Sequence, residues 1–121
     1  MERSWAWPEK AAGEAYYCRG RAYYDLKNGQ AAEADLRKAL ENLPHGYARG
    51  LASLTLADNY RDNLKDDQQA LKTYAYAYAI EEKRDRYGWM CFTSVVSAAG
   101  VLRKQQRHDE ALRMLGKVPV D

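Results

Sequence analysis

The sequence predicts an all-α fold, a right-handed α-solenoid of three helix-turn-helix repeats with six helices. Three observations predict it. Three segments of the chain can be laid over one another, each half of a segment carries apolar residues at helical spacing, and the joints between halves are short and polar. We expect the whole chain, 1–121, to form one domain with repeats at about 11–44, 47–84 and 87–118. The expected helices are 8–28, 30–43, 47–64, 67–84, 87–105 and 109–117.

Small residues recur at matching places in the three segments. The first half of each segment has a small residue followed three positions later by a large one: Gly20 and Tyr23, Ala57 and Tyr60, Ala99 and Leu102. The second half opens with an alanine and has a core-sized residue four positions later: Ala32 and Leu36, Ala70 and Tyr74, Ala111 and Leu115. Small residues let two helix axes approach closely, so each segment is expected to fold as a pair of antiparallel helices.

The joints carry residues that favour helix ends. Gly29 is typical of a helix C-terminus, and Asp66, Asp67 and Asp109 are typical of a helix start. A break between the fourth and fifth helices is expected near Asp85 to Tyr87, because of the local charge and Gly88.

The stretch from Thr73 to Ile80, TYAYAYAI, alternates like a β-strand. The repeat alignment contradicts that reading, since Tyr74 matches Leu36 and Ala77 matches Ala39. Alanine is also the best helix former. We therefore expect a helix here, with Tyr74 and Tyr78 on one face and Tyr76 partly exposed.

The pattern resembles the tetratricopeptide repeat (TPR) family. The first repeat carries the resemblance most closely, through Tyr16, Gly20, Tyr23, Ala32, Leu36, Ala39 and Pro44. The lengthened spacing of the later repeats is similar to that of kinesin light chains and of bacterial regulators that sense peptides or partner proteins. The resemblance implies that the first helix of each repeat lines a concave groove that binds a peptide or a partner protein.

One face of each first helix is therefore the candidate site. Its positions are Tyr17, Arg21 and Tyr24, then Leu54, Asp58 and Arg61, then Val96, Gly100 and Arg103. Tyrosine and arginine are frequent in binding hot spots, although a solvated helix face is the alternative interpretation. Some family members clamp the carboxylate of a chaperone tail with lysine and asparagine residues. The matching places here hold Tyr17, Arg21, Thr55, Thr93 and Ser97, so we expect no such clamp.

No constellation of catalytic residues is recognisable. His45 and His108 lie in polar joints, and no metal-binding pair or phosphate-binding glycine loop is present in the sequence. We expect no enzyme, no cofactor and no metal. The net charge of +2 gives no reason to expect nucleic acid, and no apolar run reaches the roughly 20 residues of a membrane span. Two lone cysteines, Cys18 and Cys91, favour a reduced, cytoplasmic setting over a disulfide.

The leading hypothesis is a protein-protein interaction module. The alternatives are a regulatory sensor domain of a larger signalling protein, an RNA-binding helical repeat and, last, an enzyme. Apolar residues of the third repeat exceed what one neighbouring helix can bury. They are Trp89, Phe92, Val95, Val96, Val101 and Leu102 in the fifth helix, and Leu112, Met114 and Leu115 in the sixth. We expect either self-association through this C-terminal repeat or a fragment of a longer repeat protein. Trp5 and Trp7 are expected to cover the outer end of the first helix pair.

Overall fold

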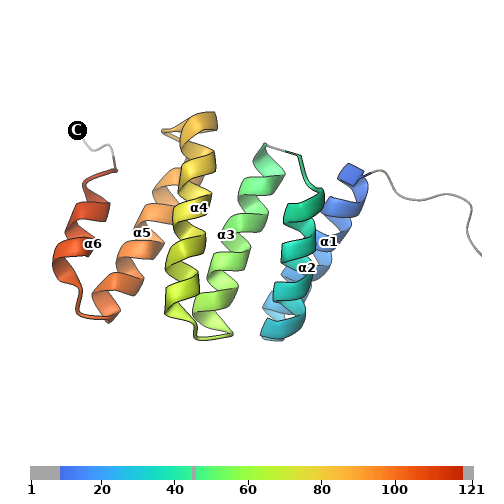
Figure 1. Cartoon of the computed structure of the whole chain (residues 1–121), viewed down its shortest axis with the longest axis horizontal. Coiled ribbons are helices and arrows are strands. Elements are labelled where there is room, and N and C mark those ends of the chain that lie inside the picture. Colours follow the sequence, from blue (N-terminus) through green and yellow to red (C-terminus); the bar gives the residue numbers. More distant parts are fainter. Residues whose placement is uncertain (1–8, 45, 119–121) are drawn as a thin grey trace, which may run out of the picture.

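The computed structural model describes residues 9–44 and 46–118, and their regular structure is entirely helical. Six helices follow one another in these ranges (Figure 1): α1 (Glu9–Asp25), α2 (Gly29–Asn42), α3 (Tyr47–Asp62), α4 (Asp67–Asp85), α5 (Trp89–Lys104) and α6 (His108–Leu115). No strand occurs in either range, so TYAYAYAI is helical, as predicted, and Tyr76 is partly exposed. The expectations for Trp5, Trp7 and His45 concern positions outside the described residues.

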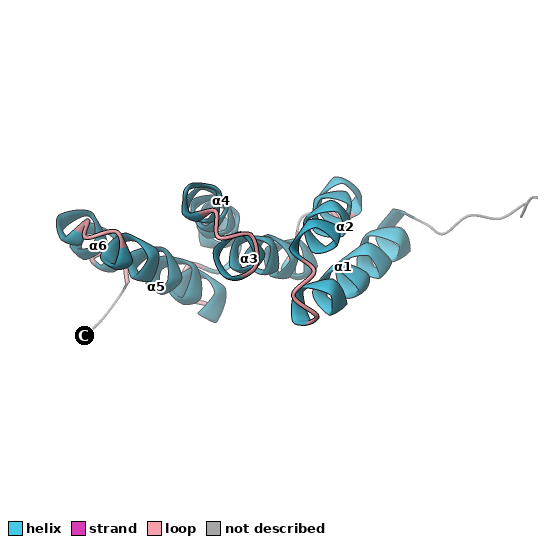
Figure 2. Ribbon diagram, turned by 90° about the horizontal axis from the view of Figure 1, so that it is seen from below, coloured by secondary structure: helices cyan, strands magenta, loops and turns pink. Residues whose placement is uncertain are grey.

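The helices form two rows. Each helix packs against the helix before and after it, and α3 also contacts α1 and α5. Within the described residues, α2 makes no such contact with α4, and α4 makes none with α6. Figure 2 shows the consequence, with α1, α3 and α5 along one side and α2, α4 and α6 along the other. The odd-numbered helices therefore share a layer in which the side chains of successive helices can meet.

The repeated small residues are buried between the helices of each pair. Ala32 and Ala70 are fully buried, and Ala111 is 6% exposed. The core-sized residue that follows is buried in the first two pairs, at Leu36 and Tyr74. In the third pair Leu115 is 41% exposed, because α6 ends there and, among the described helices, packs only against α5; Leu115 is one of the apolar residues predicted to exceed what a neighbouring helix can bury.

Two glycines let α1 lie directly against α2. A Cβ atom built on Gly20 would be 2.8 Å from Cγ of Leu36, and one built on Gly13 would be 2.8 Å from Cγ of Leu43. Real Cβ atoms do not approach other heavy atoms so closely, so any larger residue would push the two helices apart. At the predicted crossing, the backbone of α1 at Gly20 therefore lies directly against the side chain of Leu36.

The turns inside the three pairs share one feature, a residue in the left-handed backbone conformation. Lys27, Lys65 and Gln106 have positive φ angles of 64°, 55° and 65°, and each lies five residues before the repeat alanine. In the first turn the Asn28 N–H donates to the Tyr23 carbonyl at 2.9 Å, a bond that satisfies an otherwise free carbonyl at the helix end.

The third turn repeats this bond, from the Arg107 N–H to the Leu102 carbonyl, also at 2.9 Å. The second turn holds one more residue, and its bond runs from the Asp66 N–H to the Tyr60 carbonyl at 2.8 Å. A residue in the left-handed backbone conformation thus reverses the chain at the equivalent place in each pair. The second turn keeps this residue although the turn is one residue longer.

One expected helix end is corrected. Gly29 does not terminate α1, which ends at Asp25; it is the first residue of α2, and Asn28 caps that helix by accepting a hydrogen bond from the Ala31 N–H at 3.3 Å. Gly29 is required for packing, because a Cβ atom there would be 2.8 Å from Cδ2 of Leu64. Asp109 lies in the first turn of α6, in agreement with its assignment to a helix start.

The other junctions agree with the sequence. Asp66 caps α4 and accepts a hydrogen bond from the Gln69 N–H at 3.1 Å. The break between α4 and α5 falls between Asp85 and Trp89, close to where charge and Gly88 placed it.

Replacing Gly20 with leucine is expected to destabilise the protein, because the new side chain must displace Leu36. Overpacking of this kind costs about 1–3 kcal/mol, which lowers the melting temperature by several degrees. Thermal unfolding followed by circular dichroism measures the change. The matched control is Ala22→Leu at an exposed position of the same helix. Equal melting temperatures for the two variants would contradict the assigned crossing.

Candidate functional site

The residues of the predicted groove lie on the three odd-numbered helices. Tyr17, Arg21 and Tyr24 belong to α1, Leu54, Asp58 and Arg61 to α3, and Val96 and Arg103 to α5. Because α3 contacts both α1 and α5, the three sets belong to neighbouring helices of one layer. Hydrogen bonds and ion pairs join some of these residues directly, whereas the others have separate environments.

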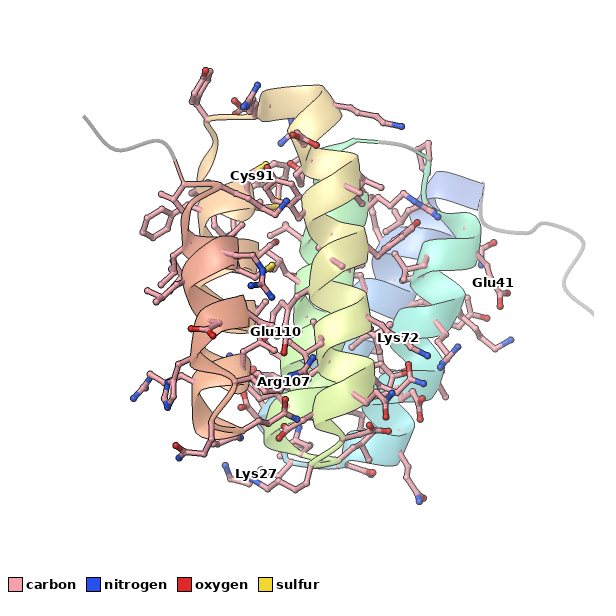
Figure 3. All side chains as sticks on the ribbon, turned by 60° about the vertical axis from the view of Figure 1, so that its left-hand side comes forward. Lys27, Glu41, Lys72, Cys91, Arg107 and Glu110 are labelled. Carbon is pink, nitrogen blue, oxygen red and sulfur yellow. The ribbon has the colours of Figure 1, made fainter. Side chains whose placement is uncertain are left out.

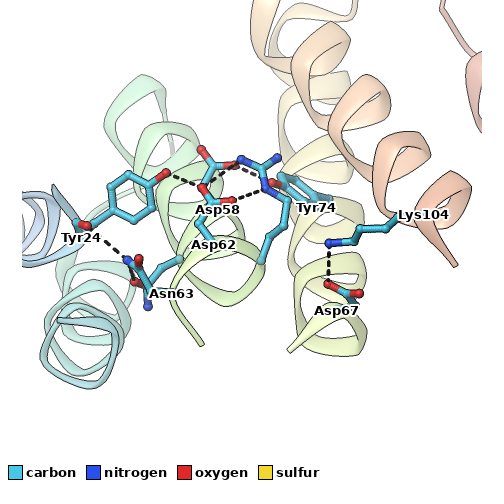
Figure 4. A network of polar contacts seen from close by, with 9 residues as sticks. Tyr24, Asp58, Asp62, Asn63, Asp67, Tyr74 and Lys104 are labelled. Atoms are coloured by element: carbon cyan, nitrogen blue, oxygen red, sulfur yellow. Dashed lines mark hydrogen bonds and ion pairs between the residues drawn. The ribbon is translucent and has the colours of Figure 1, made fainter. Parts of the chain in front are cut away.

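A polar network joins α1, α3 and α4 on this layer (Figure 4). The Tyr24 hydroxyl donates to Oδ2 of Asp62 at 2.6 Å, and Arg61 binds the same carboxylate through Nε at 2.7 Å and Nη2 at 3.0 Å. Nη2 of Arg61 also lies 3.5 Å from Oδ1 of Asp58, which accepts a hydrogen bond from the Tyr74 hydroxyl at 2.5 Å. Tyr24, Asp58 and Arg61, three of the predicted groove residues, are thus brought into one network.

Two asparagines fix this network to the rest of the fold. Asn59 is fully buried, and its Nδ2 donates to the Gly29 carbonyl at 2.9 Å. Nδ2 of Asn63 donates to Oδ1 of Asn59 at 2.8 Å and to the Tyr24 carbonyl at 3.2 Å. The end of α3 is therefore tied to the α1–α2 turn by backbone-directed hydrogen bonds, which hold the network residues in place.

Protonation in the network follows from these contacts. The hydrogen bonds from Arg61 hold the pKa of Asp62 below its ordinary value, whereas burial raises the pKa of Asp58. Burial, together with the hydrogen bond to Asp62, raises the pKa of Tyr24 to about 12. Burial likewise raises the pKa of Tyr74. At neutral pH both phenols therefore remain protonated donors.

The remaining predicted residues have different environments. Leu54 is 5% exposed and belongs to the hydrophobic core, so its assignment to an accessible groove is corrected. Tyr17 is half-buried and packs against two core clusters. Arg21 is exposed, and its guanidinium lies 5.8 Å from the ring centre of Tyr24. Its Nε is 3.5 Å from a carboxylate oxygen of Asp25.

On α5, Val96 and Arg103 are both exposed. Neither belongs to the hydrogen bonds and ion pairs of the network described above. They therefore form a separate part of the odd-helix layer.

Sequence reasoning did not include two aromatic residues that extend the same layer. Tyr47 opens α3 and Trp89 opens α5, and their ring centres are 6.5 Å apart in an edge-on arrangement. The guanidinium of Arg84 lies 5.5 Å from the ring centre of Tyr47. Each aromatic residue stands seven positions, about two helical turns, before a predicted groove residue. Extending the spacing of the groove residues by two helical turns towards the start of α3 and of α5 would have identified Tyr47 and Trp89.

The described residues contain no group of three or more His, Cys, Asp or Glu side chains placed to hold a metal ion. His108 is exposed, with a ring nitrogen 3.1 Å from Oε1 of Gln106. Cys18 and Cys91 are free thiols, the first exposed and the second buried, and burial raises the pKa of Cys91.

Among the helices of residues 9–44 and 46–118, none combines the length and apolar character needed to cross a membrane. Comparisons with protein-family models, curated proteins and solved structures gave no match to this chain.

Tyr24→Phe is expected to reduce the loss of stability at alkaline pH. The ordinary phenol pKa is 10.0, and in the folded protein that of Tyr24 is about 12. An acid whose pKa is raised by folding stabilises the protein below the lower value, and this contribution disappears as pH rises through the higher one. The free energy of unfolding of the wild type should therefore fall between these two pH values by more than that of the variant. Urea unfolding at a series of pH values measures it.

The matched control is Tyr87→Phe, since Tyr87 is 75% exposed. It should retain the pH dependence of the wild type. Tyr60, whose pKa is also raised to about 12 by burial and its bond to Glu33, leaves some dependence in every variant. Identical curves for Tyr24→Phe and the wild type would contradict the role given to the Tyr24–Asp62 bond.

Proposed function

We propose that this protein is a protein-interaction module of TPR-like architecture. Its odd-numbered helices would hold a peptide segment or a helix of a partner protein. The observation that carries the proposal is the shared layer of α1, α3 and α5, on which Tyr24 of α1 bonds to Asp62 of α3, and Arg61 links Asp62 to Asp58. The repeat pattern in the sequence supports the same architecture.

The candidate surface is held in a fixed conformation before any partner binds. Tyr24 and Arg61 are each restrained by bonds to Asp62, and Asp62 lies next to the anchored Asn63. Side chains that are already ordered lose less conformational entropy on binding than free ones. Large aromatic and forked cationic side chains in fixed positions are suited to specific recognition of another protein.

The charge of this surface favours a partner segment of mixed charge. Arg61 lies between Asp58 and Asp62, and Arg21 lies beside Asp25. Each cation is therefore close to a carboxylate, which would repel an acidic tail. Thr55, at one of the clamp positions considered above, is 5% exposed and donates its hydroxyl to the Leu51 carbonyl at 2.9 Å. A terminal carboxylate cannot reach it.

Arg21→Glu is expected to weaken peptide binding by about tenfold or more, because it reverses an exposed charge at the edge of the network. The probes are peptides selected from a random displayed library against the immobilised wild-type protein, and fluorescence anisotropy measures their dissociation constants. Arg21 is preferable to Tyr17 for this test, since Tyr17 packs against the core and its truncation would also change stability.

The matched control is Lys72→Glu, which reverses a charge at an exposed position of α4 (Figure 3). It should bind the selected peptides as the wild type does. Both variants should melt close to the wild type, because exposed substitutions change stability by only about 0.5 kcal/mol. Peptides that bind Arg21→Glu as tightly as the wild type would place the binding surface elsewhere.

A further inference from the structure

Five residues form a line along the whole of α5: Trp89, Phe92, Val96 and Arg103, which are exposed, and Gly100, which is partly buried. Their spacings of three and four residues place them on one face of the helix. The side chains are unusually bare for apolar residues, with Trp89 52%, Phe92 53% and Val96 40% exposed. We call this line the α5 stripe; from Trp89 to Arg103 it is about 21 Å long.

Gly100 is the residue of the α5 stripe for which no packing contact within the chain explains the choice of glycine. A Cβ atom on Gly13, Gly20, Gly29 or Gly50 would lie within 3.0 Å of a neighbouring side chain, so packing accounts for each of these helical glycines. A Cβ atom on Gly100 would meet nothing within 4 Å. Glycine is a poor helix former, and here it relieves no contact and no backbone strain inside the chain. It leaves a gap in the surface of α5.

The equivalent face of α3, in the preceding repeat, shows how such a face packs when neighbouring helices cover it. Phe92 and Val96 occupy on α5 the places that Gly50 and Leu54 occupy on α3. Both α3 residues are buried, and a Cβ atom on Gly50 would be 3.0 Å from Sδ of Met90, a residue of α5. On α3 this face lies against side chains of α4 and α5, among them Glu81 and Met90, whereas on α5 the described residues leave Phe92 and Val96 exposed.

The α5 stripe is symmetric about Val96. Phe92 and Gly100 lie four residues to either side of it, and Trp89 and Arg103 lie seven residues to either side. In an antiparallel pair of two such helices, Val96 faces Val96, each Phe92 comes beside the Gly100 of the other helix, and each Trp89 comes beside Arg103. Large and small residues, and aromatic and cationic residues, are thus matched.

We propose that two copies of this chain associate through α5 in a two-fold, antiparallel arrangement. The aromatic ring of Phe92 would fill the gap at Gly100, and the guanidinium of Arg103 would lie on the indole of Trp89 as a cation–π pair. Arg103 takes part in no ion pair among the described residues, so its charge is free for this contact. A parallel pair would instead place like residues together, including the two arginines.

The proposal goes beyond the interaction function proposed above: it assigns the α5 part of the candidate groove to a second copy of the chain and does not use α1 or the network. A single pair of helices is at the small end of protein interfaces, so the dimer should be weak, with a dissociation constant in the micromolar range. The dimer would occupy Val96 and Arg103, leaving α1 and α3 as the place for a partner.

The first measurement is sedimentation velocity over a concentration series from about 1 to 500 µM, which spans the expected constant. The mass should rise from 13.9 kDa towards twice that value. Gly100→Leu fills the gap that Phe92 needs and should weaken association about tenfold or more while the helix content stays unchanged. A mass that remains monomeric throughout, or a Gly100→Leu dimer as tight as that of the wild type, would overturn the proposal.

The second measurement tests the geometry by cross-linking, in a background in which the exposed Cys18 is replaced by serine. Val96→Cys should form an intermolecular disulfide rapidly on mild oxidation, because the two-fold axis brings the two Cβ atoms together. Lys72→Cys, exposed on α4, is the control and should cross-link slowly (Figure 3). Equal rates for the two cysteines would overturn the antiparallel arrangement.

A swap of large and small residues separates specific pairing from general stickiness. Phe92→Ala and Gly100→Phe should each weaken the dimer, and the double variant should restore it, because the large residue again faces a small one. A double variant no tighter than either single variant would count against the proposed register. The contrary outcome is that the selected peptides bind to the α5 stripe while no dimer forms at any concentration. In that case the stripe is a binding surface for a partner protein, and the self-association proposal is wrong.

Discussion

The close approach of helices at small residues is the constraint on which the rest of this structure depends. Gly20 lies against Leu36 with no room for a Cβ atom, and Ala32 and Ala70 are fully buried at the matching crossings. Short turns with one left-handed residue then bring the paired helices back along each other. Because each pair is tight and each turn is short, the described helices contact the helices next to them in the chain, and beyond these only α3 makes contacts, with α1 and α5.

This local packing determines where polar groups can meet. The contacts of α3 with α1 and α5 place residues that are 38 positions apart, such as Tyr24 and Asp62, within hydrogen-bonding distance. The network also reaches Tyr74, a tyrosine at a place where the first repeat has leucine. Its ring fills the core position and its hydroxyl satisfies Asp58, so one residue provides both packing and a polar contact.

Repetition also explains why equivalent residues have different exposures. Leu54 and Val96 stand at the same place in successive repeats, yet the first is 5% exposed in a core cluster that includes residues of α5, and the second is 40% exposed. The same comparison applies to Gly50 and Phe92. In a stack, the burial of a residue depends on the neighbouring repeat as much as on its own helix.

The sequence by itself determined the helical class, the pairing of helices and most junctions, because small residues, turn residues and apolar spacing act over a few helical turns. It also placed Tyr24, Asp58 and Arg61 on a common layer. It could not show that Leu54 is buried, that Gly29 is a packing residue, or that Tyr47 meets Trp89. Only the tertiary structure decided these points, because each depends on contacts between helices far apart in the chain, which no local pattern specifies.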